Sequence, residues 1–161
     1  MPSTNSRKSV SFITKLRADF PEFAFRKDMT AHWSADTQTV YYESSASPFD
    51  KIVLLHELGH AILKHADYDQ DIELLACERA AWQVARKLAP RYGVTIDDSV
   101  IQRQLDTYRT WLHARSQCPS CHTTAIQQKD LSYRCLLCAQ EWRSNEARQC
   151  RLHRYKIEKS S

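Results

Sequence analysis

Two histidines and a glutamate stand in the stretch Leu54 to Ile62, which reads LLHELGHAI. On a helix, His56 and His60 lie about 40° apart and point the same way, so their imidazoles can grip one zinc ion. Glu57 is turned about 100° from His56, where it can flank the metal and take a proton from the bound water. This HExxH pattern therefore predicts a catalytic zinc site.

The alternative is an apolar helix that carries two histidines by accident. Burying the three polar groups without partners would cost several kcal/mol, and metal binding offsets that cost. Gly59 favours the site as well, because a glycine inside a helix costs about 1 kcal/mol against alanine. The chain has only two glycines, and we expect a close backbone approach at this one.

A catalytic zinc has three protein ligands and one open position. The metzincin pattern is excluded, because Leu63 and Ala66 stand where it needs Gly and His. His65 lies about 140° around the helix from His60, so we expect it to face away from the metal. The third ligand should therefore be an acid that follows this helix in the chain.

Three acids of the next helix are candidates: Asp71, Glu73 and Glu78. A helical wheel puts Glu78 in the centre of the apolar stripe, with Leu74, Leu75, Ala81, Trp82 and Ala85 around it. Glu73 lies at the edge of the stripe, and Asp71 suits a helix start. A buried acid needs a cation, so Glu78 is the predicted third ligand; a salt bridge to an arginine is the alternative.

The segment LLHELGHAILKH, followed by ERAAWQVARKLAP, resembles the ImmA/IrrE-like zinc metallopeptidases over roughly residues 10–115. Glu78 to Ala81 would match the E-x-x-A stretch of that family, and Pro90 its closing proline. An acid often found two residues after the first is here Ala80. The resemblance implies a cytoplasmic regulatory protease that cleaves or inactivates a repressor.

The peptidase mechanism would rest on zinc, which lowers the pKa of bound water and polarises the scissile carbonyl. Glu57 would be the general base and would then pass the proton to the leaving amine. Tyr68, Tyr41 and Tyr42 are open candidates for stabilising the oxyanion. Manganese or iron could also occupy a site of two histidines and one carboxylate.

Four cysteines near the C-terminus form a second cluster. Cys118, Cys121, Cys135 and Cys138 give C-x2-C-x13-C-x2-C, which is typical of a structural zinc in a ribbon. The alternatives are redox pairs or disulfides, which need another context. His122 could replace one ligand, whereas Cys77 suits a small core position and Cys150-x2-His153 the surface.

The elements that position these residues follow local signals. We expect a helix that begins at Ser9 or Ser11 and ends before Pro21, a strand around Phe23 to Phe25 or beyond, and a hairpin with its turn at 35–37. Ser47-Pro48-Phe49-Asp50 predicts a helix start, and that helix should run to Lys64 or His65. Further helices should span Asp71 to Leu88 and Asp97 or Asp98 to Arg115.

The fold class predicted is α+β, with a minimal zincin-like domain over 9–116 and a zinc ribbon with a basic tail over 117–161. The net charge of +4 lies wholly in the last 45 residues, which hold 8 Lys/Arg and 4 Asp/Glu. Basic residues in this last part of the chain suggest that it binds nucleic acid. They are Arg143, Arg148, Arg151, Arg154, Lys156 and Lys159. Four thiolates and one zinc would carry −2, so this signal is modest.

The leading hypothesis is a cytosolic zinc-dependent endopeptidase with two zinc ions per chain and a protein or peptide substrate. The alternatives are a nucleic-acid-binding regulator with a non-catalytic zincin scaffold, or a protein that sequesters a partner without cutting it. No apolar run approaches the length of about 20 residues that a membrane span needs. We therefore expect no membrane partner and a cytoplasmic location.

Overall fold

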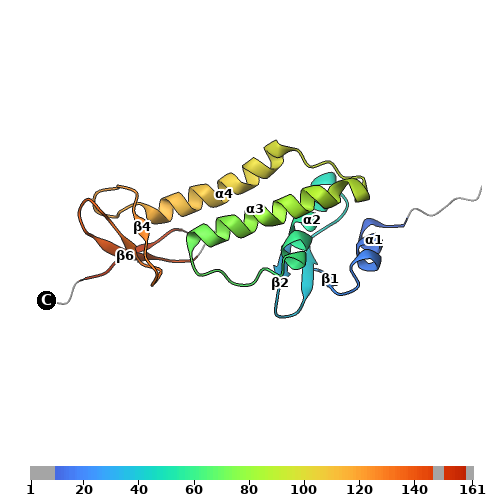
Figure 1. The fold of residues 1–161 in the computed structure, drawn as a ribbon, viewed down its shortest axis with the longest axis horizontal. Helices are drawn as coiled ribbons and strands as arrows, with labels where there is room; N and C mark the ends of the chain where they lie inside the picture. The colour runs from blue at the N-terminus through green and yellow to red at the C-terminus, as the bar shows by residue number, and fades with distance from the viewer. Residues whose placement is uncertain (1–9, 147–150, 159–161) are drawn as a thin grey trace, which may run out of the picture. The chain divides into compact units, whose positions relative to one another are not determined.

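A computed structural model describes residues 10–146 and 151–158. The class is α+β, with four α-helices and two small sheets in the described part of the chain (Figure 1). Arg148, Cys150 and Lys159, which the sequence analysis names, lie outside the described residues. Among the residues described, no helix is both long and apolar enough to cross a membrane.

The chain divides into two compact units. The first comprises Met1–Ala66 and Ala80–Ile96, and the second comprises Asp67–Arg79 and Asp97–Ser161. Helix α3 (Asp71–Leu88) contributes one half to each. The predicted domain boundary at residue 117 rests on the positions of the two sequence motifs and not on packing, and it stays a prediction.

A three-stranded sheet and two helices begin the first unit: α1 (Phe12–Asp19), β1 (Ala24–Lys27), β2 (His32–Ser34), β3 (Thr39–Tyr42) and α2 (Pro48–Ile62). The strand order is β1-β3-β2, with β1 parallel and β2 antiparallel to the central strand. The predicted hairpin is confirmed, and Gln38 closes its turn with a positive φ of 49°. Helix α2 packs on β2 and β3 through an apolar face that includes Leu54, Leu55 and Leu58.

Helix α2 starts where the sequence predicts, and Ser47 and Asp50 form a capping box there. The Ser47 hydroxyl accepts from the Asp50 amide at 3.0 Å, and the Asp50 carboxylate accepts from the Ser47 amide at 3.0 Å. These hydrogen bonds lower the pKa of Asp50. Two amides at the helix start are thereby satisfied, which fixes where the helix that carries His56 and His60 begins.

The end of α2 differs from the prediction. The helix stops at Ile62 rather than at Lys64 or His65, because Lys64 takes a left-handed φ of 54°. The Lys64 amide donates to the Ala61 carbonyl and the His65 amide to the His60 carbonyl, both at 3.0 Å. These bonds form a Schellman motif with lysine where glycine is usual.

Helix α3 has the predicted bounds, Asp71–Leu88. The Glu73 carboxylate accepts from the amides of Asp69 and Gln70, so Glu73, not Asp71, caps the start of this helix. A 3-10 turn, Ala89–Tyr92, then ends at Gly93, whose φ is 66°. Helix α4 (Asp98–Ser116) matches the last helix predicted.

The second unit also contains a four-stranded antiparallel sheet in the order β4-β5-β6-β7. Its strands are β4 (Ile126–Gln127), β5 (Tyr133–Arg134), β6 (Glu141–Ser144) and β7 (Arg154–Lys156). Tyr133 and Trp142 stack at 5.5 Å in a small core with Cys118 and Cys135. The cysteine motif therefore belongs to a folded sheet module.

Replacing the Ser47 cap should weaken the first unit. We expect Ser47→Ala to lower the free energy of unfolding by about 1 kcal/mol, because the Asp50 amide loses its acceptor. Ser45→Ala, outside the capping box, is the matched control. Chemical denaturation of the two variants measures the difference, and equal midpoints would contradict the assignment.

Candidate metal centres

His56, His60 and Glu78 converge at one point. One ligand atom from each residue lies within 4.8 Å of the others. The Nε2 atoms of the two histidines are 3.2 Å apart. His56 and Glu78 are each only 6% exposed, so two of the three groups are nearly removed from water.

The spacing of the two imidazole nitrogens suits a metal ion. Zinc–nitrogen bonds of about 2.0–2.1 Å at a tetrahedral angle place the two nitrogens about 3.3 Å apart. The observed 3.2 Å between the Nε2 atoms of His56 and His60 is close to that value. The donor set of two imidazoles and one carboxylate is compatible with zinc.

A close backbone approach between α2 and α3 builds this site. A Cβ atom on Gly59 would lie 2.4 Å from the carbonyl oxygen of Ala81, so only glycine fits. The His56 ring stacks on Trp82, with ring centroids 4.1 Å apart. Glu78 lies one turn before Trp82 on the same continuous helix, which brings its carboxylate to the histidines.

The other acids weighed as third ligand lie elsewhere. Glu73 caps the start of α3. Asp71 accepts a hydrogen bond from the Tyr133 hydroxyl and lies 3.8 Å from the Arg115 guanidinium. Glu57 is half-buried and directly follows His56 on α2.

His65 is not among the residues that converge on the candidate metal site, but it does contact His60. Its Nδ1 lies 2.8 Å from the Nδ1 of His60. His65 reaches this place because α2 ends at Ile62, before the predicted end at Lys64 or His65, and the chain turns back. This second contact of His60 has no signal in the HExxH motif.

The structure does not choose among the tyrosines considered for oxyanion stabilisation. Tyr41 stacks on His32, with centroids 4.5 Å apart. Tyr42 ends β3, and Tyr68 is half-buried after α2. Their predicted role stays open.

The four cysteines form the second centre. The Sγ atoms of Cys118 and Cys138 are 3.6 Å apart, and those of Cys121 and Cys135 are 3.5 Å apart. A disulfide bond is about 2.05 Å long, so these thiols are not bonded. Zinc–sulfur bonds of about 2.3 Å at a tetrahedral angle place sulfurs about 3.8 Å apart, which the cluster nearly matches.

Both C-x2-C loops have the same backbone. The amide of His122 donates to the Cys118 carbonyl at 2.9 Å, and that of Ala139 to the Cys135 carbonyl at 3.0 Å. His122 and Ala139, each just after a second cysteine, have left-handed φ values of 61° and 58°. Two equivalent turns therefore present the four thiols. His122 is not among the clustered groups, so nothing supports it as a replacement ligand.

Cys121 and Cys138 of this cluster differ in the direction of their pKa shifts. Hydrogen bonds with Thr123 lower the pKa of Cys121 to about 6. At Cys138 the Gln140 amide favours the thiolate, but burial and the neighbouring thiols raise the pKa to about 12. Thiolates this close repel one another, so all four ionise together only around a cation.

A buried polar network, absent from the sequence analysis, braces the second unit. Arg115 is 2% exposed, and its guanidinium donates twice to the Glu146 carboxylate at 2.9 Å. It also donates to the Tyr133 hydroxyl at 3.2 Å. Burial and the hydrogen bond to Asp71 raise the pKa of Tyr133.

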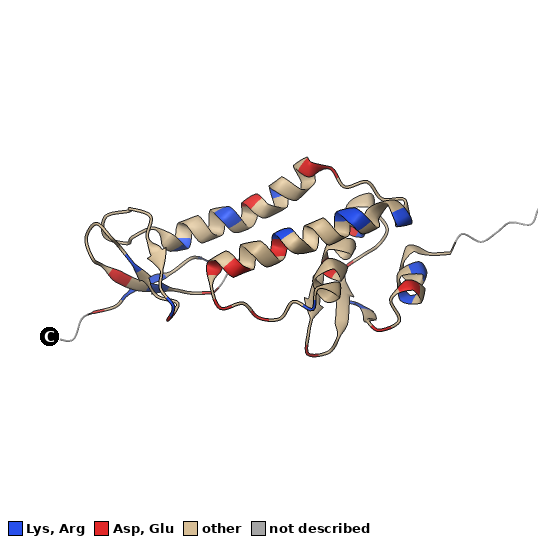
Figure 2. Cartoon of the chain, viewed as in Figure 1, with Lys and Arg blue, Asp and Glu red and all other residues tan. Residues whose placement is uncertain are grey.

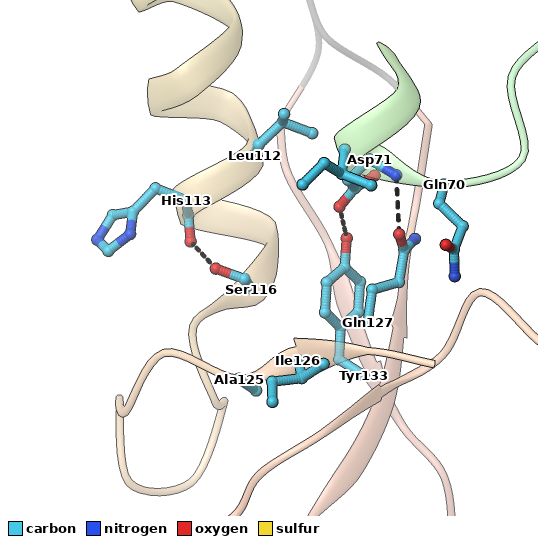
Figure 3. Close-up of a pocket in the computed structure, with 10 residues that line it drawn as sticks. Gln70, Asp71, Leu112, His113, Ser116, Ala125, Ile126, Gln127 and Tyr133 are labelled. Carbon is cyan, nitrogen blue, oxygen red and sulfur yellow. Dashed lines mark hydrogen bonds between the residues drawn. The ribbon is translucent and has the colours of Figure 1, made fainter. Parts of the chain in front are cut away.

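A cavity of about 370 Å³ adjoins this network (Figure 3). Asp71, Gln127 and Tyr133 supply polar atoms to its wall, and the Gln127 side chain accepts from the Asp71 amide at 2.8 Å. Ile72 and Ile126 add apolar surface, at 75% and 56% exposure. Asp71 is therefore committed to packing in the second unit.

Comparison with protein-family models, with curated proteins and with solved structures finds no match for this chain. The function of this chain is therefore inferred from the two centres themselves.

A side chain at position 59 should disrupt the histidine centre. We expect Gly59→Ala to lower the free energy of unfolding by about 1–3 kcal/mol through overpacking, although alanine is the better helix former. Metal binding by the histidines should weaken with it. Gly93→Ala has no atom within 4 Å of its added Cβ and should leave metal binding intact, although the left-handed φ of 66° at this position should cost about 1 kcal/mol of stability. Denaturation and metal titration of both variants test this.

Replacing one buried cysteine should abolish metal binding by the four-cysteine cluster. We expect Cys135→Ser to bind one metal ion fewer and to expose Trp142, which shifts tryptophan emission to longer wavelength. Cys77→Ser is the control, because Cys77 is not part of the cluster. A full metal count in Cys135→Ser would contradict the assignment.

Proposed function

We propose that this chain is a zinc-dependent endopeptidase with its catalytic centre at His56, His60 and Glu78. The observation that carries the proposal is the convergence of these three ligand groups within 4.8 Å of one another, with Glu57 directly following His56 on α2. A purely structural metal would need the ligands but not that neighbouring carboxylate. A catalytic metal needs a base in its position.

The residues would divide the work as follows. Zinc, when bound, supplies Lewis acidity that activates water and polarises a peptide carbonyl. His56, His60 and Glu78 would hold the ion and leave one position open. Glu57 would remove the proton of the attacking water and return it to the leaving amine, so its net protonation is unchanged after one turnover.

The biological setting is a further part of the proposal. The resemblance of LLHELGHAILKH and ERAAWQVARKLAP to ImmA/IrrE-like metallopeptidases supports a regulatory protease of the cytoplasm whose substrate is a protein such as a repressor. The cluster of Cys118, Cys121, Cys135 and Cys138 would hold a second, structural zinc. It would stabilise a ribbon that has too small a core to fold readily without one.

Nucleic-acid binding through the ribbon is the weaker alternative. Two of its basic side chains are paired with acids: Arg143 with Asp130 at 3.3 Å, and Arg134 with Glu141 at 3.7 Å. Figure 2 marks acidic residues beside the basic ones in this part of the chain. Such pairing reduces the attraction for phosphates, so the charge pattern does not favour this function over proteolysis.

The decisive variant is Glu57→Gln in the full chain loaded with zinc. We expect it to keep its metal but to cleave at least about 100-fold more slowly, because an amide cannot act as the base. Glu22→Gln, an exposed carboxylate of the same unit, is the control. New N-termini released from a diverse peptide library, counted by mass spectrometry, provide the rate.

Two results would contradict the peptidase proposal. One is equal cleavage by wild type and Glu57→Gln, which would point to a contaminating protease. The other is a zinc-loaded wild type that cuts nothing in the library. Tight, salt-sensitive binding of nucleic acid that survives Glu57→Gln would then favour the regulator instead.

A further inference from the structure

His60 has neighbours on both of its ring nitrogens. Its Nε2 lies 3.2 Å from the Nε2 of His56, on the side where Glu78 also offers an oxygen. Its Nδ1 lies 2.8 Å from the Nδ1 of His65. The second distance is that of a strong hydrogen bond between two imidazoles.

The chain holds His65 in this place by three backbone features. The left-handed Lys64 turns the chain back at the end of α2. The His65 amide then donates to the His60 carbonyl at 3.0 Å. Trp33 of β2 donates from its indole nitrogen to the His65 carbonyl at 2.8 Å. His65 is therefore tied to both the helix and the sheet of the first unit.

The hydrogen bond dictates a pattern of protons. An imidazole that offers Nε2 to a metal carries its proton on Nδ1. His60 then donates from Nδ1 to the Nδ1 of His65, which must carry its own proton on Nε2. The acceptor fixes both the tautomer and the ring orientation of His60, as outer partners of metal-bound histidines do.

We propose that His65 is a positioning residue that orients His60 for binding a divalent cation at the histidine centre. This inference rests on the metal site of the proposed function and adds a member that the HExxH motif does not contain. His65 acts through His60 and is not itself a ligand. Its loss should therefore weaken metal binding without removing any donor atom.

Three full-length variants separate the roles of His65. His65→Leu keeps bulk and removes the acceptor, whereas His65→Asn places a carbonyl oxygen where Nδ1 stood. His113→Asn replaces an exposed histidine of α4 as the control. Zinc affinity is measured by competition with a chelator. Cobalt is then bound in place of zinc. Its absorption spectrum distinguishes the histidine centre from the four thiolates, because sulfur ligands give different bands.

We expect His65→Leu to weaken zinc binding at the histidine centre by about 10–100-fold and to change the cobalt spectrum. His65→Asn should recover most of the affinity, and His113→Asn should bind as wild type does. Wild-type affinity in His65→Leu would overturn the inference. Equal losses in the Leu and Asn variants would also overturn it, because bulk rather than the acceptor would then matter.

The same titration distinguishes this inference from the proposed function. If the wild-type chain loads only the four cysteines, the histidine centre is not a metal site and both proposals fail. If wild type and His65→Leu load both centres equally well, only the role of His65 fails. The peptidase proposal would then stand unchanged.

Discussion

The backbone contact between α2 and α3 at Gly59 and Ala81 governs the histidine centre. Any side chain at position 59 would meet a carbonyl oxygen at 2.4 Å. His56 and His60 stand on either side of this contact along α2, and Glu78 precedes it on α3. Separating the helices would draw the carboxylate away from both imidazoles. One missing Cβ thus makes a three-residue cluster possible.

The free-energy cost of burying polar groups at this contact must be offset by other interactions. Leu54, Leu55 and Leu58 of α2 are fully buried, and the two histidines sit among them. A carboxylate and two imidazoles in such surroundings are costly unless an ion or hydrogen bonds satisfy them. A divalent cation offsets the cost at all three groups together, which is the physical case for a metal-dependent function.

Local rules were sufficient for much of the fold. The capping box at Ser47 sets one helix start, and the apolar wheel around Glu78 identifies the acid that meets the histidines. The spacing of the four cysteines predicts their cluster. Each of these signals lies within a few residues of chain or follows a single helical period, so no knowledge of tertiary structure was needed.

Long-range contacts and an unusual backbone conformation could not be predicted from the sequence. The turn that returns His65 to His60 depends on a lysine in a left-handed conformation, which local preferences assign to glycine or asparagine. Asp71 accepts a hydrogen bond from Tyr133, which is 62 residues away in the sequence, and no local sequence pattern predicts such a pair. The Arg115 network likewise joins segments that only the folded unit brings together.

The central claim is that His56, His60 and Glu78 hold a metal ion. Elemental analysis of zinc per chain, for wild type and for His60→Ala and Glu78→Ala, tests it most directly. The account predicts two zinc ions in wild type and one in each variant, with the cysteine cluster retained. One zinc in wild type and an unchanged count in both variants would contradict it.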